Sequence, residues 1–461
     1  MNSIDFIKKS RSGEIDIVEN TKKTVDEIKK INKEYNYFLY IAENEAIAQA
    51  KALSKSKKIG KLYGLPVTIK DCICVKDMES RAGSRILEGY KPVFDATVVE
   101  KIKSEGGIIV GKTSQDIFGF GSFNVNVGLN DKIPKNPFDK GRTTGGSSGG
   151  SSGITQKLDM PHIAITESTG GSIASPASYC GVYGLCPTYG RVSRYGLITF
   201  SNSMDKIGVT GKGIEEAALM LGIISGHDEL DSTSKEIEVP DYSKREKKEF
   251  RVAIVKESTG KGVEEGVKKN LIKKLGKIKY DFVSLPINFK YSIQTYYLIN
   301  MAEVSTNLAM LCGMRYGVHE ELIGNFNEYF RKVRSHNFEK EAKRRIILGT
   351  FARMSGFRDA YYLKALKIRT KIIEEYKKIF KKYDIIITPS MPNIAPKFSE
   401  ISKMSPLENY LADIMTAGPN LAGFPHLSIP SGFSEKMPTG MLVTGDHFNE
   451  KKLIDFARLL V

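Results

Sequence analysis

The stretch G-L-P-V-T-I-K-D (Gly64–Asp71) contains the pattern from which the fold of the chain follows. Leu65 to Ile69 is a short apolar run, with a glycine before it and the polar pair Lys70 and Asp71 after it. A short apolar run bounded in this way is typical of a buried strand. We therefore expect a strand here, with Lys70 at its end.

Similar strand-like runs recur along the chain, and helical patterns lie between them. The runs are Ile108–Val110, Ile163–Ile165, Val252–Val255, Phe282–Leu285, Ile385–Ile387, Leu427–Ile429 and Met441–Val443. One helical pattern is long, from about Asn337 to Lys382. Such alternation favours a sheet wrapped by helices. We expect an α/β fold with one large mixed, mostly parallel twisted β-sheet surrounded by helices.

The 461 residues are expected to form a single domain over 1–461, with a helical N-terminal segment at about 1–60 and a polar excursion at about 226–249. No apolar run is long enough to span a membrane, and the N-terminus lacks the apolar core of a signal peptide. The five cysteines fit a reducing compartment better than a disulfide scaffold. We expect a soluble, cytoplasmic protein without a membrane partner.

Charge alone does not choose a function for the chain. The net charge of +16 comes from 69 Lys and Arg against 53 Asp and Glu. This excess permits contact with nucleic acid and equally favours solubility. Much of it lies in Lys-rich, helix-like stretches such as Glu374–Lys382, which are usually solvated. Cys72 and Cys74 lack the spacing of a zinc site and have no histidine pair nearby, so no metal site is expected.

A Gly/Ser run, T-T-G-G-S-S-G-G-S-S-G (Thr143–Gly153), is open to three interpretations. By itself it resembles a flexible linker. A phosphate-binding loop is disfavoured because no Gly-Lys-Ser/Thr closes the run. The third interpretation depends on a strand-like run at 162–166 that leads into T-G-G-S (Thr169–Ser172). Two glycines before a serine allow backbone N–H groups to converge as an oxyanion hole.

A nucleophilic serine needs a base, and the chain offers no histidine in a recognisable triad context. Lysine is the alternative. A lysine amine with its ordinary pKa near 10.4 is almost fully protonated at pH 7, but burial lowers that pKa by several units. Lys70 at the end of an apolar strand suits such a base, although a lysine after a strand is usually just solvated. Both interpretations stay open at this point.

The stretches G-G-S-S-G-G-S (Gly145–Ser151), T-G-G-S-I (Thr169–Ile173) and G-L-P-V-T-I-K-D together resemble the amidase signature family. The resemblance implies that Ser172 is the nucleophile and Lys70 the base. It also implies that Ser147, in a cis peptide, relays protons between them. The N–H groups around Thr169, Gly170 and Gly171 would form the oxyanion hole.

Within that family, other blocks resemble the A subunits of glutamyl-tRNA(Gln)/aspartyl-tRNA(Asn) amidotransferases. These blocks are Pro176–Leu197, Lys343–Phe351, Asp359–Tyr362 and Asn420–Pro425. The resemblance implies a glutamine site in which Arg345 pairs with the α-carboxylate and Asp413 with the α-ammonium. Arg344 is the second choice for the carboxylate, and Tyr297 lies in the matching pocket segment. A planar guanidinium suits a carboxylate, so the chemistry agrees.

The chain departs from the family pattern at three places. Ser168 replaces the usual aspartate before T-G-G-S, with Glu167 one position earlier. Ala174 stands where an arginine is usual, and Cys186 where a lysine is common. None of these changes removes a catalytic atom, but they alter the support of the loop that carries Ser172.

The resemblance implies a glutaminase that works in a heterotrimer with B and C subunits and passes ammonia to the B subunit. There the ammonia would amidate glutamate or aspartate on a mischarged tRNA. ATP and Mg²⁺ are expected in that partner, which would also make most of the tRNA contacts, and no cofactor is expected in this chain. Two alternatives stay open: a stand-alone amidase acting on another small carboxamide, and a weakly active assembly or scaffold subunit.

Overall fold

The computed structural model describes every residue of the chain except 57–58, 129, 247–248 and 323. The first predicted strand is confirmed as β2 (Pro66–Lys70), and all of its residues are buried. It lies between β3 (Ile108–Thr113) and β4 (Ile163–Ser168) and pairs in parallel with both. Parallel neighbours end at the same edge of a sheet, so the ends of β2 and β4 lie side by side.

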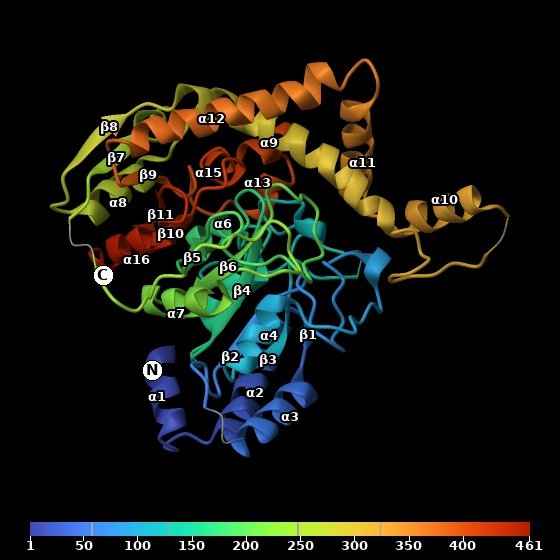
Figure 1. Cartoon of the computed structure of the whole chain (residues 1–461), viewed down its shortest axis with the longest axis vertical. Coiled ribbons are helices and arrows are strands. Elements are labelled where there is room, and N and C mark those ends of the chain that lie inside the picture. The colour runs from blue at the N-terminus through green and yellow to red at the C-terminus, as the bar shows by residue number, and fades with distance from the viewer. Residues whose placement is uncertain (57–58, 129, 247–248, 323) are drawn as a thin grey trace.

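These strands belong to one 11-stranded sheet, in the order β1-β3-β2-β4-β6-β5-β10-β11-β9-β7-β8 (Figure 1). Parallel pairing occurs in two groups, β3-β2-β4 and β9-β7-β8, and the other neighbours are antiparallel. The sheet is mixed, as predicted, but it is not mostly parallel. The remaining strands are β1 (Phe38–Ile41), β5 (Tyr183–Cys186), β6 (Lys206–Gly211), β7 (Val252–Val255), β8 (Tyr280–Val283), β9 (Ile385–Pro389), β10 (His426–Ser434) and β11 (Met437–Thr444).

Short connections explain part of the antiparallel pairing. Only Glu435 and Lys436 separate β10 from β11, and both have left-handed backbone angles, with φ of 49° and 65°. A two-residue turn of this kind joins antiparallel strands. A parallel pair instead needs a crossover of a dozen or more residues, for which this connection has no room.

Helices surround the sheet (Figure 1). Those of the first half of the chain are α1 (Ser3–Arg11), α2 (Ile17–Tyr35), α3 (Glu43–Ser54), α4 (Thr97–Ser104), α5 (Gly149–Lys157), α6 (Ala174–Cys180) and α7 (Ile214–Ile224). Those of the second half are α8 (Glu265–Leu275), α9 (Pro286–Asn307), α10 (Phe326–Asn337), α11 (Lys340–Arg353), α12 (Lys364–Phe380), α13 (Phe398–Ile401), α14 (Pro406–Leu411), α15 (Ala417–Leu421) and α16 (Glu450–Arg458).

The single long helix expected from Asn337 to Lys382 is wrong, because the chain breaks there into separate elements. α11 ends at Arg353, and Met354 takes an extended conformation. Gly356 follows with a φ of +86°, in the left-handed region that ends helices. A π-helical turn over Asp359–Leu363 then leads into α12. The break lets α11 and α12 both pack against α9.

Two further segments differ in part from expectation. The helical N-terminal segment is confirmed as α1, α2 and α3, but it also contributes the edge strand β1 between α2 and α3. Outside 247–248, the polar segment 226–249 forms no helix or strand. Strands β5 and β6, at the centre of the sheet, were not predicted at all.

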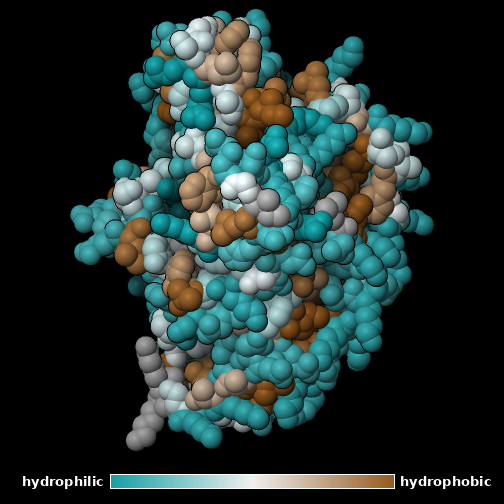
Figure 2. Space-filling view, turned by 90° about the vertical axis from the view of Figure 1, so that its right-hand side faces the viewer, coloured by the Kyte–Doolittle hydropathy of each residue, from teal (hydrophilic) through white to brown (hydrophobic). Residues whose placement is uncertain are grey.

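The surface is largely hydrophilic with scattered apolar areas. Figure 2 shows this on the side toward which α10 projects in Figure 1. Exposed apolar side chains of the described chain include Phe326 of α10 and Ile347 of α11. None of the helices in the described chain has the length and apolar composition that crossing a bilayer demands.

Candidate active site

The Gly/Ser run is buried structure and not a linker. Every residue from Thr143 to Thr155 is buried, and α5 begins inside the run at Gly149. Glycine is needed there because Tyr37 packs against the helix: a Cβ at Gly153 would lie 2.2 Å from the Tyr37 ring, and one at Gly150 would lie 2.5 Å from its carbonyl oxygen. The linker interpretation is therefore wrong.

Lys70 and Ser147 meet at the start of this run. Lys70 Nζ donates to Ser147 Oγ at 2.7 Å, and both side chains are fully buried. Its other partners are the backbone carbonyl of Glu167 at 3.0 Å and the Glu167 carboxylate at 2.8 Å. The peptide bond between Gly146 and Ser147 is cis, as the family resemblance implied.

Ser172 lies in the loop between β4 and α6, beside the same Gly/Ser run. The N–H of Ser148 donates to the carbonyl oxygen of Ser172 at 3.3 Å, which ties the two loops together. The Ser172 side chain retains slight exposure, about 5%. The Ser147 and Ser172 hydroxyls are not hydrogen-bonded to each other in the described structure, so the last link of the expected relay stays a prediction.

The loop before Ser172 leaves backbone donors free. In the part of the chain that the structure describes, the N–H groups of Thr169, Gly170 and Gly171 have no hydrogen-bond acceptor. Close packing is what requires glycine here, since neither glycine has a positive φ. A Cβ at Gly170 would lie 2.9 Å from the Tyr296 ring, and one at Gly171 would lie 2.8 Å from Asp413 Oδ1. Free, fixed donors beside a serine suit an oxyanion hole.

The three departures from the family pattern are all buried near this loop. Ser168 Oγ donates to the carbonyl of Gly170 at 3.3 Å, and Ala174 begins α6. Cys186, at the end of β5, lies with Sγ 3.6 Å from Asn420 Oδ1. Asn420 in turn donates its Nδ2 to the carbonyl of Thr169. The loop is therefore supported from α15 through the Asn420 side chain.

A cavity of about 280 Å³ contains two of the predicted substrate residues, Tyr297 and Arg345. Arg344 also lines it, so the structure brings both arginines to one wall. Other lining residues come from segments that the sequence did not single out, among them Asp116, Phe120, Glu341 and Tyr410. No sequence signal pointed to these residues, because their contact with the cavity depends on tertiary packing.

Arg345 is the buried member of the arginine pair. Its guanidinium donates to Glu341 at 3.0 Å and to Asn300 at 3.2 Å, and lies 4.5 Å from the Phe120 ring centroid. Arg344 also pairs with Glu341, but about 35% of its side chain is exposed. Glu341 therefore neutralises part of the charge of both arginines.

Asp413 lies between the cavity and the loop that carries Ser172. Its Oδ2 accepts a hydrogen bond of 3.2 Å from the Tyr297 hydroxyl, whereas Oδ1 has no partner among the described residues. Burial raises the pKa of Asp413 to about 6, although the Ser122 and Tyr297 hydroxyls oppose the shift. A buried carboxylate with a free oxygen suits a cationic group of a ligand.

A metal centre finds no support in the described residues, where no three His, Cys, Asp or Glu side chains gather to hold an ion. The arrangement offers instead a serine, a buried hydroxyl–amine pair and free backbone N–H groups. Together these groups can perform acyl transfer.

Comparisons with known proteins agree with that chemistry. A family model named Amidase matches residues 19–454. The chain is 42% identical to the A subunit of glutamyl-tRNA(Gln) amidotransferase from Clostridium botulinum, over 98% of this chain and 94% of the relative. It is 43% identical to the protein of that name from Thermoanaerobacter pseudethanolicus, over 96% and 92%. The crystal structure of the Thermotoga maritima A subunit superimposes with a TM-score of 0.82 at 36% identity, covering 99% of this chain and 93% of that one.

Proposed function

The chain belongs to the amidase family, and on that premise we propose that it is the glutaminase subunit of a tRNA-dependent amidotransferase. One observation carries this proposal. A buried guanidinium, Arg345, lines the cavity, and a buried carboxylate with a free oxygen, Asp413, lies between the cavity residue Tyr297 and Gly171 of the loop that carries Ser172. A cationic and an anionic side chain beside one small cavity match the carboxylate and ammonium of a free amino acid.

In the proposed reaction, Ser172 Oγ attacks the side-chain amide carbon of glutamine. Its proton passes through Ser147 to Lys70, and the N–H groups of the Thr169–Gly171 loop stabilise the oxyanion. A proton returns to the leaving nitrogen, and ammonia departs to leave a glutamyl ester on Ser172. Water then hydrolyses the ester through the same groups.

The proposal assigns the later steps to other chains. Ammonia would pass to the B subunit, which would use ATP and Mg²⁺ to amidate Glu-tRNA(Gln), Asp-tRNA(Asn) or both, and the C subunit would complete a cytoplasmic heterotrimer. The names of the relatives, each an A subunit, support a multi-subunit assembly. The mischarged tRNA would bind mainly through the B subunit.

Ammonia release from glutamine tests the proposal. We expect release by the purified chain together with its B and C subunits, and a loss of about 10⁴-fold or more in Ser172→Ala and in Lys70→Ala. Circular dichroism and thermal melting should show that both variants stay folded. Full activity in Ser172→Ala would refute the mechanism.

The same assay separates the alternatives. Hydrolysis of many simple amides but not glutamine would indicate a stand-alone amidase. Unchanged amidation by the assembled complex with Ser172→Ala, supplied with glutamine as the nitrogen donor, would indicate that this chain only supports assembly.

A further inference from the structure

The hydrogen bonds at Lys70 continue beyond it into a buried chain of groups. Glu167 Oε2 lies 2.8 Å from Lys70 Nζ, which also bonds Ser147. Glu167 Oε1 lies 2.8 Å from the hydroxyl of Thr169, and the same hydroxyl lies 2.8 Å from Asp205 Oδ1. An unbroken path of hydrogen bonds thus runs from Ser147 to Asp205.

If both Glu167 and Asp205 were ionised, the path would have too few hydrogen-bond donors for its contacts. The Thr169 hydroxyl has one proton to donate, and an ionised carboxylate only accepts. Because the hydroxyl lies at hydrogen-bond distance from two carboxyl oxygens, one of the two carboxyls must itself donate. The described path therefore carries a proton on Glu167 or on Asp205.

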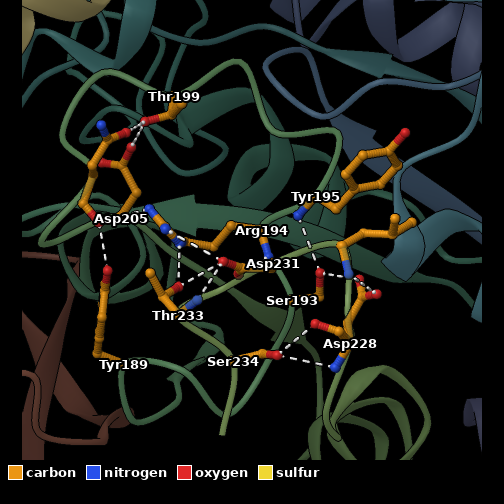
Figure 3. Close-up of polar contacts among 12 residues, drawn as sticks. Tyr189, Ser193, Arg194, Tyr195, Thr199, Asp205, Asp228, Asp231, Thr233 and Ser234 are labelled. Carbon is orange, nitrogen blue, oxygen red and sulfur yellow. Dashed lines mark hydrogen bonds and ion pairs between the residues drawn. The ribbon is translucent and has the colours of Figure 1, made fainter.

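Asp205 is the better place for that proton in the resting protein. Its Oδ2 accepts from the Thr199 hydroxyl, as Figure 3 shows, and from the N–H groups of Phe200 and Ser201. Its Oδ1 faces only Thr169 in this network. Burial and the neighbouring Glu167 carboxylate raise the pKa of Asp205 to about 7. Glu167 is then left ionised against Lys70.

We propose that Glu167 is the final proton acceptor of the serine relay, so that Lys70 passes protons on and need not begin as a neutral amine. The inference rests on the proposed function for its substrate. Glu167 does not touch the substrate, and it acts through Lys70 as a positioning residue. Lys70 and Glu167 have side-chain exposures of 0% and 2%, so bulk water cannot readily replace either partner.

The transfer from Ser172 to Ser147 belongs to the proposed relay, and the later transfers each have a donor and an acceptor on the path. The bond from Ser172 Oγ to the amide carbon forms while the Ser172 proton moves to Ser147 Oγ. The Lys70 ammonium first gives a proton to Glu167 Oε2 and becomes a neutral amine, and the lone pair of that amine then takes the Ser147 proton. The carboxylate becomes a carboxylic acid, and Lys70 is an ammonium again at the end of the step. When ammonia leaves, the shifts reverse: Glu167 returns a proton to Lys70, Lys70 returns one to Ser147, and the Ser147 proton goes to the departing nitrogen.

Other titratable groups face Glu167 from the elements packed around it. They are Lys70 on β2, Cys72 just after it, Asp205 before β6, Cys186 on β5 and Tyr296 on α9. Lys70 is the member that donates directly to the Glu167 carboxylate. Successive side chains on a strand point to opposite faces, so a carboxylate at position 168 on β4 would face away from Lys70. The relay as described thus depends on the carboxylate at position 167.

The test measures the reactivity of Ser172 without any substrate. Phenylmethylsulfonyl fluoride sulfonylates activated serines, and intact-mass spectrometry with Ser172→Ala as the blank gives the labelling rate of Ser172 in the full chain. The rate is measured from pH 6 to pH 10 for the wild type, Glu167→Gln and Glu167→Asp. Glu216→Gln, which removes a buried carboxylate that bonds Ser3 on another face of the protein, serves as the control for stability.

Removing the acceptor should leave only the lysine amine as the base, and free amines of lysine are scarce at neutral pH. We expect Glu167→Gln to label about 100-fold more slowly than the wild type at pH 7 and to recover toward pH 10. Glu167→Asp should retain part of the rate with the wild-type pH profile. Glu216→Gln should keep both rate and profile.

An unchanged profile in Glu167→Gln, or one moved to lower pH, would overturn the inference. The second result is expected if Glu167 merely holds the charge on Lys70. Absence of labelling at Ser172 in the wild type would overturn it as well. Failure to hydrolyse glutamine, with labelling as expected, would instead refute the proposed function and leave this relay standing.

Discussion

The hydroxyl of Tyr297 donates to Oδ2 of Asp413 and leaves Oδ1 of that carboxyl unpaired beside Gly171. Tyr297 also stacks on Tyr410 with ring centroids 4.0 Å apart, and its ring centroid lies 5.5 Å from the Arg345 guanidinium. One aromatic side chain therefore fixes the distance between the two charged groups proposed to hold glutamine.

Asp413→Asn should make the free protein more stable and bind glutamine less well. The pKa of Asp413 lies above the ordinary aspartate value, so folding favours its protonated form. This carboxyl therefore destabilises the fold progressively as pH rises from the ordinary aspartate pKa of about 4 to about 6, and by a constant amount at higher pH. We expect Asp413→Asn to gain about 2 kcal/mol in unfolding free energy at pH 8, about half of that at pH 5 and little below about pH 4, measured by denaturant unfolding.

The same titration predicts the pH dependence of binding. Only the ionised carboxyl attracts an α-ammonium, so KM for glutamine in the wild type should rise as pH falls through about 6. In Asp413→Asn, KM should be high at every pH. A wild-type KM that stays flat between pH 5 and 8 would argue against Asp413 as the ammonium partner.

Arg345→Met and Arg344→Met should differ sharply in their effect on glutamine. Charge-assisted hydrogen bonds to a carboxylate contribute about 1.5–3 kcal/mol, so we expect Arg345→Met to raise KM by roughly 10- to 150-fold. Arg344 is more exposed, and its loss should change KM by no more than about threefold. Steady-state ammonia release checks both, and the reverse order of effects would make Arg344 the carboxylate ligand.

Gly171→Ala should lower activity strongly because its Cβ would lie 2.7 Å from Thr416 Oγ1 and 2.8 Å from Asp413 Oδ1. The loop must shift to relieve these contacts, which moves the oxyanion donors, and we expect kcat to fall by about 100-fold or more. Gly222→Ala in α7 is a matched control. Its nearest neighbour would be the Tyr242 ring at 3.6 Å, so activity should persist and stability should rise by about 0.5–1 kcal/mol.

Asn420→Ala should lower kcat more than it raises KM. Its amide holds the carbonyls of Thr169 and Met204, which anchors the oxyanion loop, and Asn420 is not among the described residues that line the cavity. We expect kcat to fall by about 10- to 100-fold, because an anchored donor is worth several kcal/mol to the transition state. A variant with an unchanged kcat would show that the loop is held without this side chain.

Local pattern was sufficient to predict much of the sheet. Strand β7 occupies the predicted residues Val252–Val255, and β2, β3, β4 and β9 begin within one residue of their predicted starts. The sequence Y-G-L-C of β5 gives no such signal, because it is short and contains a glycine. Its extended form is held by antiparallel pairing with β6 and β10, partners distant in sequence. Local pattern does not show which distant strands pair. It also does not show whether a pair is parallel or antiparallel.

Some residues of the site could likewise be predicted from the sequence, and others could not. Lys70, Ser147 and Ser172 follow from motifs, and the structure joins the first two directly. Glu341 and Tyr410 have no motif, although Glu341 contacts Arg345 and Tyr410 stacks on Tyr297. The role of Glu167 was also missed, because sequence position alone does not show that its carboxylate faces Lys70.

The groups that transfer protons and the residues that line the cavity come largely from different parts of the fold, and this division has an evolutionary consequence. Lys70 and Glu167 lie at the ends of the neighbouring strands β2 and β4, whose register tolerates little change. Much of the cavity wall comes instead from α11, α14 and the segment before α14, outside the sheet. Substitutions in those outer segments can change which amide binds while the catalytic residues stay in place. One ancestral framework can thereby give rise to enzymes with unrelated substrates.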